Sequence, residues 1–319
     1  MPVDVLLVSL GSTHGWRVAD ALLAESMRRA GATVEVVAAK PPREVRTFAL
    51  TDLTWSLAAR RAAKEALDRE EPRAIVYSTS TAALLAPRPG AIRFDALAAG
   101  NRPGRHGIWQ RPLEARRIAS APLLVPMSEQ ALDEAPARRA EAVVVPVPVA
   151  PSGEAAARDI AAITYASDPV KKGLPRVLEA WAKARRDGEE LVVVTEHDVA
   201  APGVRVARAR GEEFRALLRR SRAYVVAPRR EDFGIAQLEA LADGCALVTT
   251  APPGPYVARD IARELDPRLV GDDLATAIRT ALDDPVPGYA ERARALLQPF
   301  APAAVDAVVA NELLPRLLA

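Results

Sequence analysis

The chain has 319 residues, about twice the usual size of a single domain, which favours two domains or one large α/β domain. Hydrophobic residues make up 50% of the chain and charged residues 26%, a composition that excludes an intrinsically disordered protein. The 43 basic and 41 acidic residues leave a net charge of only +2, and aromatic residues make up 4%, so we expect no nucleic-acid partner.

Apolar runs and cysteine content point to a cytoplasmic protein. The chain enters an apolar run directly after Asp4, without the basic leader or cleavage site of a signal peptide. No apolar run approaches the roughly 20 residues that span a bilayer, so no transmembrane segment is expected. The one cysteine, Cys245, has no partner for a disulfide, and with three histidines it offers no zinc cluster.

Short β-branched runs alternate with longer helical patterns in the first half, which is typical of a parallel sheet covered by helices. Helices are predicted over 16–30, closed by Gly31, and over 52–69, with Asp52 as its cap. The predicted strands of this half are 3–10, 33–39, 73–78, 91–94, 123–126 and 142–147.

A proline-rich linker divides the chain near residue 150. Pro146, Pro148, Pro151, Ser152 and Gly153 lie within eight residues, which is the best linker signal in the sequence. The same alternation then resumes, with predicted strands 160–165, 191–195, 223–226 and 246–249 and predicted helices 174–186, 212–220 and 234–242. Two α/β domains of this kind bind ligands at the carboxyl ends of their strands.

The first strand is followed by a glycine-containing turn, Gly11-Ser12-Thr13-His14-Gly15. The turn lacks the G-x-G-x-x-G spacing of a dinucleotide fold, and the chain has no P-loop motif. Close approach of a ligand to the backbone would explain the glycines, and a tight turn alone would also explain Gly11.

Two lysines precede a predicted helix in the second half. Pro175 fits only the first turn of that helix, so Lys171 and Lys172 lie before its N-terminus. Cations are unfavourable at this positive end of a helix unless an anion lies between them. A phosphate would satisfy the helix amides and Lys172 together, whereas Lys171 is expected to point into water.

The segment 227–244 carries two glutamates. Glu231 lies in a predicted loop, and Glu239 falls about 40° from Ile235 on the helical wheel, at the edge of the apolar face. A carboxylate there needs a partner, which sugar hydroxyls could supply. The alternatives are a salt bridge from Glu239 to a neighbouring arginine, and for Glu231 a loop acid favoured beside a helix N-terminus.

Glu231, Phe233-Gly234 and Glu239 together resemble the E-x7-E motif of retaining glycosyltransferases of family 4, which have the two-domain GT-B fold. The lysine segment resembles that family's donor-phosphate segment, and residues 244–249 and 254–256 resemble its following strand and glycine-rich loop. The likeness is strong over about 160–260, and in the first 150 residues it rests on architecture.

The resemblance implies a role for each motif residue. Glu231 and Lys172 would be catalytic, facing the donor sugar and the diphosphate, and Glu239 would hold the ribose. Backbone amides at Phe233, Gly234 and Ile235 would also contact the donor. Family members usually carry an arginine about five residues before the lysine. Ser167 holds that place here, and Arg229 or Arg230 could supply the missing cation.

The implied fold is α/β, with two Rossmann-like parallel-sheet domains facing across a cleft. Residues 1–150 would form the acceptor domain, joined by a returning C-terminal helix at 300–319, and 151–299 the donor domain. The implied reaction retains configuration, needs no metal or cofactor, and uses a UDP- or GDP-linked donor sugar. The acceptor would be a sugar, a lipid-linked molecule or another small molecule, and peripheral contact with the inner membrane face is compatible with this role.

The acceptor is expected at the turn 11–15 and in the segment 95–110, which mixes cations with one aromatic residue. Its candidate residues there are Asn101, Arg102 and His106, although the segment reads equally well as a flexible surface loop. Other enzymes of the GT-B fold, such as a sugar-nucleotide epimerase or a phosphorylase, remain alternatives. A non-catalytic sugar-binding subunit is a further one, favoured by Ser167 and opposed by the presence of both glutamates and Lys172.

Overall fold

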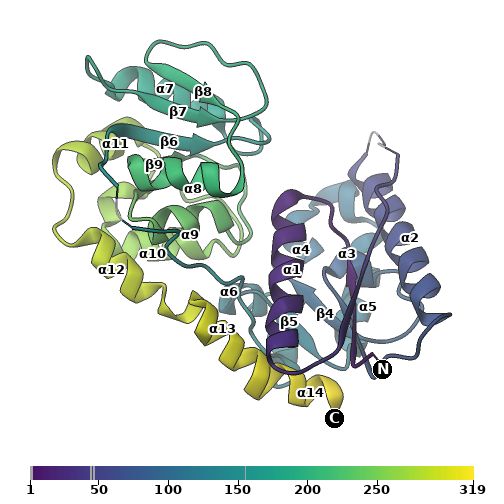
Figure 1. Ribbon diagram of the computed structural model, residues 1–319. Coiled ribbons are helices and arrows are strands. Elements are labelled where there is room, and N and C mark those ends of the chain that lie inside the picture. The colour runs from purple at the N-terminus through teal and green to yellow at the C-terminus, as the bar shows by residue number, and fades with distance from the viewer. Residues whose placement is uncertain (1–2, 44, 46, 155) are drawn as a thin grey trace. The chain divides into compact units, whose positions relative to one another are not determined.

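The computed structural model describes residues 3–43, 45, 47–154 and 156–319, and they form two compact units (Figure 1). The first unit runs to Pro148 and includes Pro302–Ala319, and the second unit is Val149–Ala301. Each unit is built on a parallel five-stranded sheet.

The sheet of the first unit has the order β2-β1-β3-β4-β5. Its strands are β1 (Val5–Ser9), β2 (Val34–Ala38), β3 (Ala74–Tyr77), β4 (Ala91–Phe94) and β5 (Leu124–Pro126). The helices and turns are α1 (His14–Arg29), α2 (Phe48–Leu67), α3 (Ser80–Ala83), α4 (Ala98–Asn101), η1 (Gly104–Gly107), α5 (Gln110–Ser120), α6 (Glu129–Leu132) and η2 (Pro136–Glu141).

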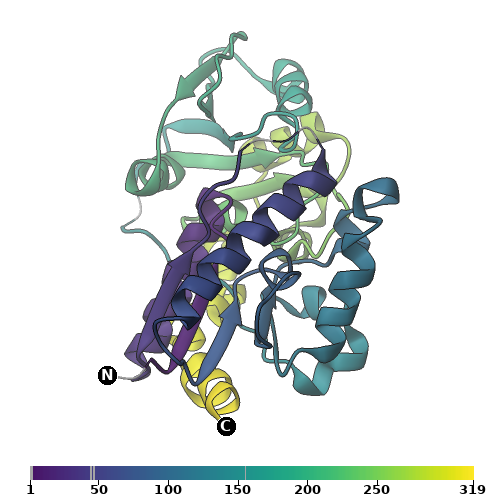
Figure 2. The same ribbon diagram turned by 90° about the vertical axis from the view of Figure 1, so that its right-hand side faces the viewer.

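The first unit has two hydrophobic cores, one on each face of its sheet, and successive residues of β1 contribute to them in turn. Leu6 and Val8 pack with residues of α2, α3 and α5, whereas Val5 and Leu7 pack with α1 and with the C-terminal segment. Because side chains of a strand point alternately to opposite faces, helices cover both faces of the sheet (Figure 2).

The C-terminal segment consists of α13 (Pro302–Val308), the π-helical turn η5 (Val309–Leu313) and α14 (Leu314–Leu318), where the sequence predicts one helix at 300–319. Asp306 anchors the segment to α1, accepting a hydrogen bond from Ser26 Oγ at 2.5 Å and from Arg29 Nη2 at 2.8 Å. The segment therefore belongs to the first unit although it follows the second in sequence.

Two predictions for the first unit are wrong. The helix α2 begins four residues before Asp52 and is capped by Thr47, whose side chain accepts from Leu50 N. The predicted strand 142–147 does not form. Val143 N donates to Leu124 O and Val145 N to Pro126 O, and these bonds stop where the short strand β5 ends at Pro126.

The sheet of the second unit has the order β10-β9-β6-β7-β8. Its strands are β6 (Ile160–Tyr165), β7 (Leu191–Val194), β8 (Val204–Ala207), β9 (Ser221–Val226) and β10 (Ala246–Thr249). Its helices and turns are α7 (Leu174–Ala184), α8 (Gly211–Arg220), α9 (Ile235–Ala242), α10 (Val257–Leu265), η3 (Pro267–Leu269), α11 (Leu274–Asp283), α12 (Tyr289–Leu296) and η4 (Gln298–Phe300). The sequence did not predict β8, a half-exposed edge strand in which Arg205 interrupts the apolar run.

The strand orders set where a ligand can enter each unit. In the second unit the chain runs outward from β6 to β7 and β8, then returns to the other side for β9 and β10. The order therefore reverses between β6 and β9, and in open α/β sheets ligands bind outside the carboxyl ends of the strands at such a reversal. In the first unit the corresponding reversal lies between β1 and β3.

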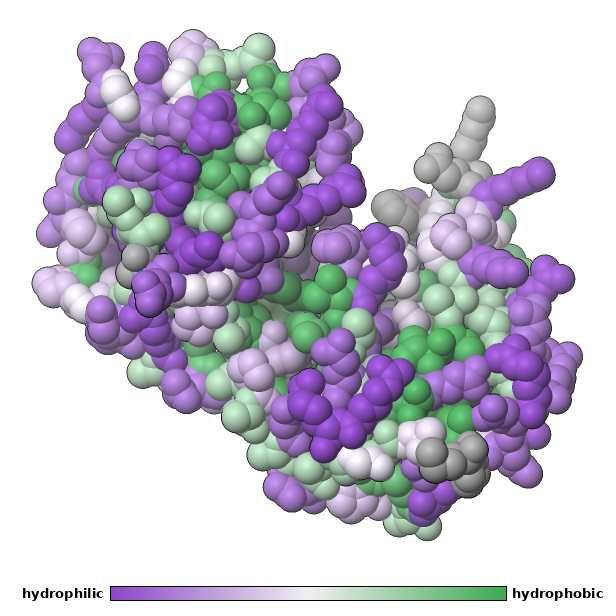
Figure 3. All heavy atoms as spheres, viewed as in Figure 1, coloured by the Kyte–Doolittle hydropathy of each residue, from purple (hydrophilic) through white to green (hydrophobic). Residues whose placement is uncertain are grey.

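None of the helices in the described part of the chain is long and apolar enough to cross a membrane. In the view of Figure 3, hydrophilic side chains cover most of the surface of each unit, and hydrophobic side chains show between them. The exposed large hydrophobic residues include Val18, Val36, Leu50, Leu57, Ile108 and Val170.

Candidate active site

The reversal point of the second unit brings two predicted site residues into direct contact. Lys172 follows β6 and Glu231 follows β9, and Lys172 Nζ lies 2.7 Å from Glu231 Oε2. Their side chains are 19% and 11% exposed. The sequence predicted separate partners for these two groups, phosphate and donor sugar. In the structure each is the other's partner.

Gly173 makes the approach of these two loops possible. It has a left-handed φ of +69°, and a Cβ there would lie 1.7 Å from Ala227 O, so only glycine fits. Arg229 N also donates to Lys171 O at 3.0 Å across the same two loops. The α7 helix then begins at Leu174 with Pro175 in its first turn, which places both lysines before the helix as predicted.

The two lysines differ in exposure. Lys171 is exposed, as the solvated alternative expected, whereas Lys172 is half-buried against Glu231. Asp168 shapes the loop, because its Oδ1 accepts hydrogen bonds from Val170 N and Lys171 N. Ser167, at the place of the family's arginine, is exposed in this loop.

Both the backbone and the side chain of Glu231 are fixed by contacts with neighbouring residues. Its N–H donates to Pro253 O, and Gly254, with a φ of +116°, packs so closely that a Cβ would lie 2.2 Å from Glu231 O. Glu231 Oε2 also accepts a hydrogen bond from Gln237 Nε2 at 2.9 Å. Sequence reasoning missed Gln237. The available signal was an amide residue two positions into a mostly apolar helix.

A buried tyrosine lies within the electrostatic field of Glu231. Tyr256 is fully buried, and its hydroxyl is 3.1 Å from Thr249 Oγ1. Burial raises the pKa of Tyr256, and the negative charge of Glu231 raises this pKa further. Tyr256 is therefore a neutral phenol at physiological pH.

The start of α9 lies three residues after Glu231. Gly234 is its N-cap and Ile235 its first residue, so the unpaired N–H groups of the first turn and the positive end of the helix are close to the Glu231 loop. Phe233 is buried, and its ring centroid lies 6.2 Å from that of Phe300. Phe233 thus anchors the loop by packing, so its ring does not face a ligand at this position.

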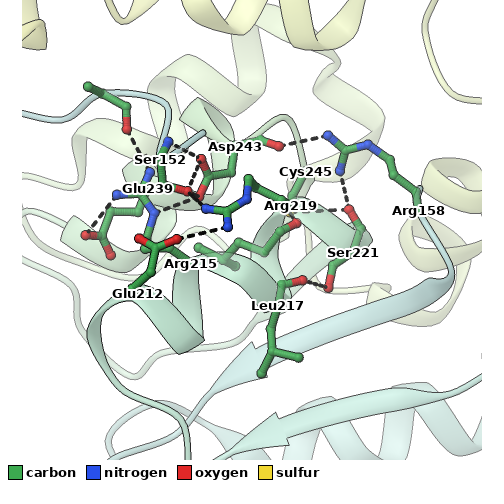
Figure 4. Close-up of polar contacts among 12 residues, drawn as sticks. Ser152, Arg158, Glu212, Arg215, Leu217, Arg219, Ser221, Glu239, Asp243 and Cys245 are labelled. Carbon is green, nitrogen blue, oxygen red and sulfur yellow. Dashed lines mark hydrogen bonds and ion pairs between the residues drawn. The ribbon is translucent and has the colours of Figure 1, made fainter. Parts of the chain in front are cut away.

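Glu239 projects from α9 toward Arg215 of α8 (Figure 4). Arg215 Nη1 lies 3.5 Å from Glu239 Oε1, so the salt-bridge alternative is present in the structure. Burial raises the pKa of Glu239, and Arg215 acts in the opposite direction. The Glu239 side chain keeps 26% exposure and can still meet a ligand.

Arg215 itself is fixed by stronger contacts (Figure 4). Its Nε donates to Asp243 Oδ2 at 2.6 Å and its Nη2 to Ala150 O at 2.7 Å. The buried Asp243 carboxylate also accepts from Ser152 N and Oγ. This network joins α8 and α9 to the segment at the start of the second unit.

Cys245 lies beside this network and is fully buried, with its Sγ 3.1 Å from Leu218 O. Burial raises the pKa of the thiol to about 12. The group is therefore a protonated packing residue and no nucleophile.

The two arginines next to the motif differ in their surroundings. Arg230 Nε donates to Asp232 Oδ1 at 2.6 Å, whereas the Arg229 side chain is exposed. Burial raises the pKa of Asp232, and Arg230 lowers it. Arg229 is accordingly the better placed of the two to meet an anionic ligand.

The predicted acceptor residues fall on two segments of the first unit. Gly11 to Gly15 connect β1 to α1, where Thr13 caps the helix by accepting from Trp16 N at 3.3 Å. Gly11 has a φ of +59°, so the tight-turn alternative accounts for this glycine. His14 is exposed at the first position of α1, and Ser12 is half-exposed beside it.

The second acceptor segment is helical where the sequence left open a flexible loop. Asn101 ends α4, and His106 lies in η1. Arg102 binds the Asp52 carboxylate with two hydrogen bonds, Nε to Oδ2 at 2.7 Å and Nη2 to Oδ1 at 3.1 Å. The charge of Arg102 is therefore compensated within the unit.

Comparisons with known proteins agree on the fold. Residues 158–284 match the family model described as "Glycosyl transferases group 1". No curated protein sequence matches the chain.

Among the described residues, no group of three or more histidine, cysteine or acidic side chains could hold a metal ion.

The most similar solved structures include WaaG, a glycosyltransferase involved in lipopolysaccharide biosynthesis, with a TM-score of 0.70 and 15% identity over 97% of this chain and 100% of that one. HepE from Anabaena, in complex with UDP and glucose, has a TM-score of 0.66 and 14% identity over 98% and 99%. Sucrose-phosphate synthase from Thermosynechococcus elongatus has a TM-score of 0.64 and 16% identity over 96% of each chain. The chain thus has the α/β GT-B fold of these proteins, as predicted.

Proposed function

We propose that the chain is a retaining glycosyltransferase that moves a sugar from a nucleotide-diphosphate donor to an acceptor hydroxyl. The family-model match over 158–284 and the GT-B fold support sugar transfer as the general activity. Within that general activity, we further propose a retaining outcome, a nucleotide-linked donor and the residue roles described below.

The observation that carries the proposal is the Lys172–Glu231 pair at the reversal point between β6 and β9. It places one cation and one carboxylate, 2.7 Å apart, beside the positive start of α9. A diphosphate needs a cation and helix amides, and a sugar needs a carboxylate that accepts hydroxyl hydrogen bonds. The reversal point of the second unit brings all three together.

Charge explains how these groups would promote the reaction. Breaking the bond between sugar and phosphate leaves negative charge on the departing nucleoside diphosphate. Lys172 and the amides of α9 would stabilise this charge where it develops. Electrostatic stabilisation of this kind is usually the largest single contribution to the rate enhancement of an enzyme. Glu231 would orient the donor sugar, and Glu239 would accept hydrogen bonds from the ribose.

The donor nucleotide is proposed to be UDP or GDP, and a structural neighbour that holds UDP and glucose supports this class. Residues 149–301 would bind the donor, and the turn 11–15 with Asn101, Arg102 and His106 would meet the acceptor. The acceptor is proposed to be a sugar, a lipid-linked molecule or another small molecule. The protein is proposed to act in the cytoplasm, with peripheral contact at the inner membrane face where the acceptor is lipid-linked.

A non-catalytic sugar-binding subunit is the second candidate. One observation favours it, because Ser167 stands exposed where the family's second phosphate-binding cation is usual. The two candidates differ in a simple measurement, since only an enzyme hydrolyses or transfers the donor sugar.

The proposal is tested with a thermal-shift screen of UDP, GDP, ADP and their sugars, followed by donor hydrolysis and transfer assays. A bound nucleotide at 100 times its dissociation constant stabilises the folded state by about 2.7 kcal/mol. We expect stabilisation by UDP or GDP, and turnover that persists in EDTA. Binding without turnover would select the non-catalytic candidate, and loss of turnover in EDTA with recovery in Mg²⁺ would contradict the metal-independent mechanism.

A further inference from the structure

Gln237 is a buried polar residue in an otherwise apolar part of α9. It is the third residue of the helix and only 1% exposed, with the fully buried Leu238, Ala240 and Leu241 close to it in sequence. Burying a side-chain amide costs free energy that an aliphatic side chain of similar size would not. In return, its Nε2 donates to Glu231 Oε2 at 2.9 Å, and the amide also forms a hydrogen bond with the buried Tyr256 hydroxyl, which lowers the pKa of Tyr256.

Lys172 and Gln237 bind the same oxygen of Glu231. Lys172 Nζ lies 2.7 Å from Oε2 and Gln237 Nε2 lies 2.9 Å from it. The two donors differ in mobility, because Lys172 has a flexible side chain with 19% exposure, whereas Gln237 is enclosed. Only Lys172 can leave for a different anion.

A diphosphate bound beside the loops that follow β6 and β9 would compete with Glu231 for Lys172. Once Lys172 turns to phosphate, Glu231 is left as a nearly buried carboxylate without its countercharge, which costs free energy and favours its displacement. The hydrogen bond from Gln237 remains, and the backbone of Glu231 stays clamped by Pro253 and Gly254.

We propose that Gln237 is a positioning residue that holds the Glu231 carboxylate in place when the donor's diphosphate draws Lys172 away. The inference rests on the proposed function and assigns a role in it to one of the seven residues between the two glutamates of the motif. The nucleoside diphosphate itself has no contact with Gln237 in this scheme. Removal of the amide should therefore affect the step in which Glu231 acts and spare diphosphate binding.

The experiment compares Gln237→Leu with Leu241→Met. Leu241 lies one turn further along α9 and is equally buried, so its volume-conserving exchange measures the effect of disturbing the helix packing alone. For each variant, kcat and the donor KM are measured, together with the affinity for UDP or GDP, whichever binds the wild type, by calorimetry. Gln237→Leu should lower kcat about 10- to 100-fold, the range of one hydrogen bond to a charged group. Its diphosphate affinity should stay within about twofold of wild type, and Leu241→Met should change neither quantity by more than about twofold.

A double-mutant cycle separates positioning from structural support. In a Glu231→Ala background, Gln237→Leu should lower kcat by less than about twofold more, because no carboxylate is left to hold. An equal loss in both backgrounds, or a parallel loss of kcat, diphosphate affinity and melting temperature, would overturn the proposal. Wild-type kcat in Gln237→Leu would also overturn it while leaving the proposed function intact. A wild-type protein that neither binds nucleotide nor transfers sugar would remove both.

Discussion

Each unit carries a lysine or arginine paired with a carboxylate near the carboxyl ends of its strands, and the two pairs differ in exposure. In the first unit, Arg93 Nη1 lies 3.2 Å from Asp20 Oδ1, and the side chains are 1% and 2% exposed. In the second unit, Lys172 and Glu231 are 19% and 11% exposed. A fully enclosed pair can only hold the fold together, whereas a pair that keeps some exposure can exchange partners with a ligand.

The Arg93–Asp20 pair also has further buried partners within the first unit. Asp20 also accepts from Ser9 Oγ at 2.5 Å, and Arg93 donates to Ala19 O and lies under the Trp16 ring. Burial raises the pKa of Asp20 and lowers that of Arg93, and each partner counteracts the shift of the other. A guanidinium in such a closed network is a structural group, although it lies close to the predicted acceptor turn.

The largest effect is expected from breaking the enclosed pair. Arg93→Met should lower the free energy of unfolding by about 3–5 kcal/mol, because Asp20 is left buried without its countercharge. Urea unfolding followed by circular dichroism measures the change. Adding Asp20→Asn should recover part of the loss. Lys172→Met serves as the contrast, with a smaller change of about 1–2 kcal/mol, because Gln237 still donates a hydrogen bond to Glu231. Equal losses at Arg93 and Lys172 would show that exposure does not separate the two pairs.

A smaller but functional effect is expected at Glu231. Glu231→Ala should lower kcat roughly 100- to 1000-fold, as for loss of a group that acts on the reacting centre, while UDP or GDP still binds. Steady-state kinetics and calorimetry report the two quantities separately. Glu239→Gln is the matched comparison and should raise the donor KM more than it lowers kcat. The reverse pattern in the two variants would mean that the glutamates have exchanged roles.

Replacing Lys172 tests whether its charge binds the phosphates of the donor. Lys172→Ala should weaken nucleoside diphosphate binding about 10- to 100-fold and leave the affinity for the nucleoside nearly unchanged, since its partner is phosphate. The neighbouring Lys171→Ala, at an exposed position of the same loop, should change either affinity by less than about twofold. If both lysines weakened the two ligands equally, the loop would serve the fold and not the phosphate.

The smallest effect concerns pH and Glu239. Its raised pKa means that the folded state disfavours the charged carboxylate, which costs stability above the folded pKa. Glu239→Gln should therefore match or exceed wild-type stability at pH 7, by no more than about 1 kcal/mol. This advantage should disappear as the pH falls below the ordinary value of 4.5. Thermal unfolding between pH 3 and 8 measures it, with the exposed Glu212→Gln as a control, and a marked loss of stability at pH 7 would show that the pair with Arg215 is net stabilising.

Local patterns in the sequence predicted most of the second unit. The strands β6 and β10 have the predicted bounds because buried parallel strands read as continuous apolar runs. The motif residues were also recognisable, since a lysine loop and an E-x7-E segment are contiguous in the chain. The strand predicted over 142–147 failed because its β-branched composition carries no information about its neighbour, and the hydrogen bonds donated by Val143 and Val145 end with the short strand β5.

Contacts between distant segments could not be predicted. The Lys172–Glu231 pair joins residues 59 positions apart, and Arg215 reaches Glu239 from a different helix. Which of 43 basic residues meets a given carboxylate depends on helix packing, which no local spacing encodes. Gln237 was missed for a related reason, because the left-handed turn at Gly234 folds it back toward the Glu231 loop.

The close packing at Gly173 and Gly254 limits how this chain can vary. Any side chain at these positions would collide with the backbone of Ala227 or Glu231. A single substitution of either glycine would therefore displace the loop that packs against it. Mutational libraries meant to change donor preference should therefore leave both glycines fixed and diversify the exposed neighbours Ser167 and Arg229. The same two glycines offer a marker for distant relatives, because they should persist in chains whose charged residues have already diverged.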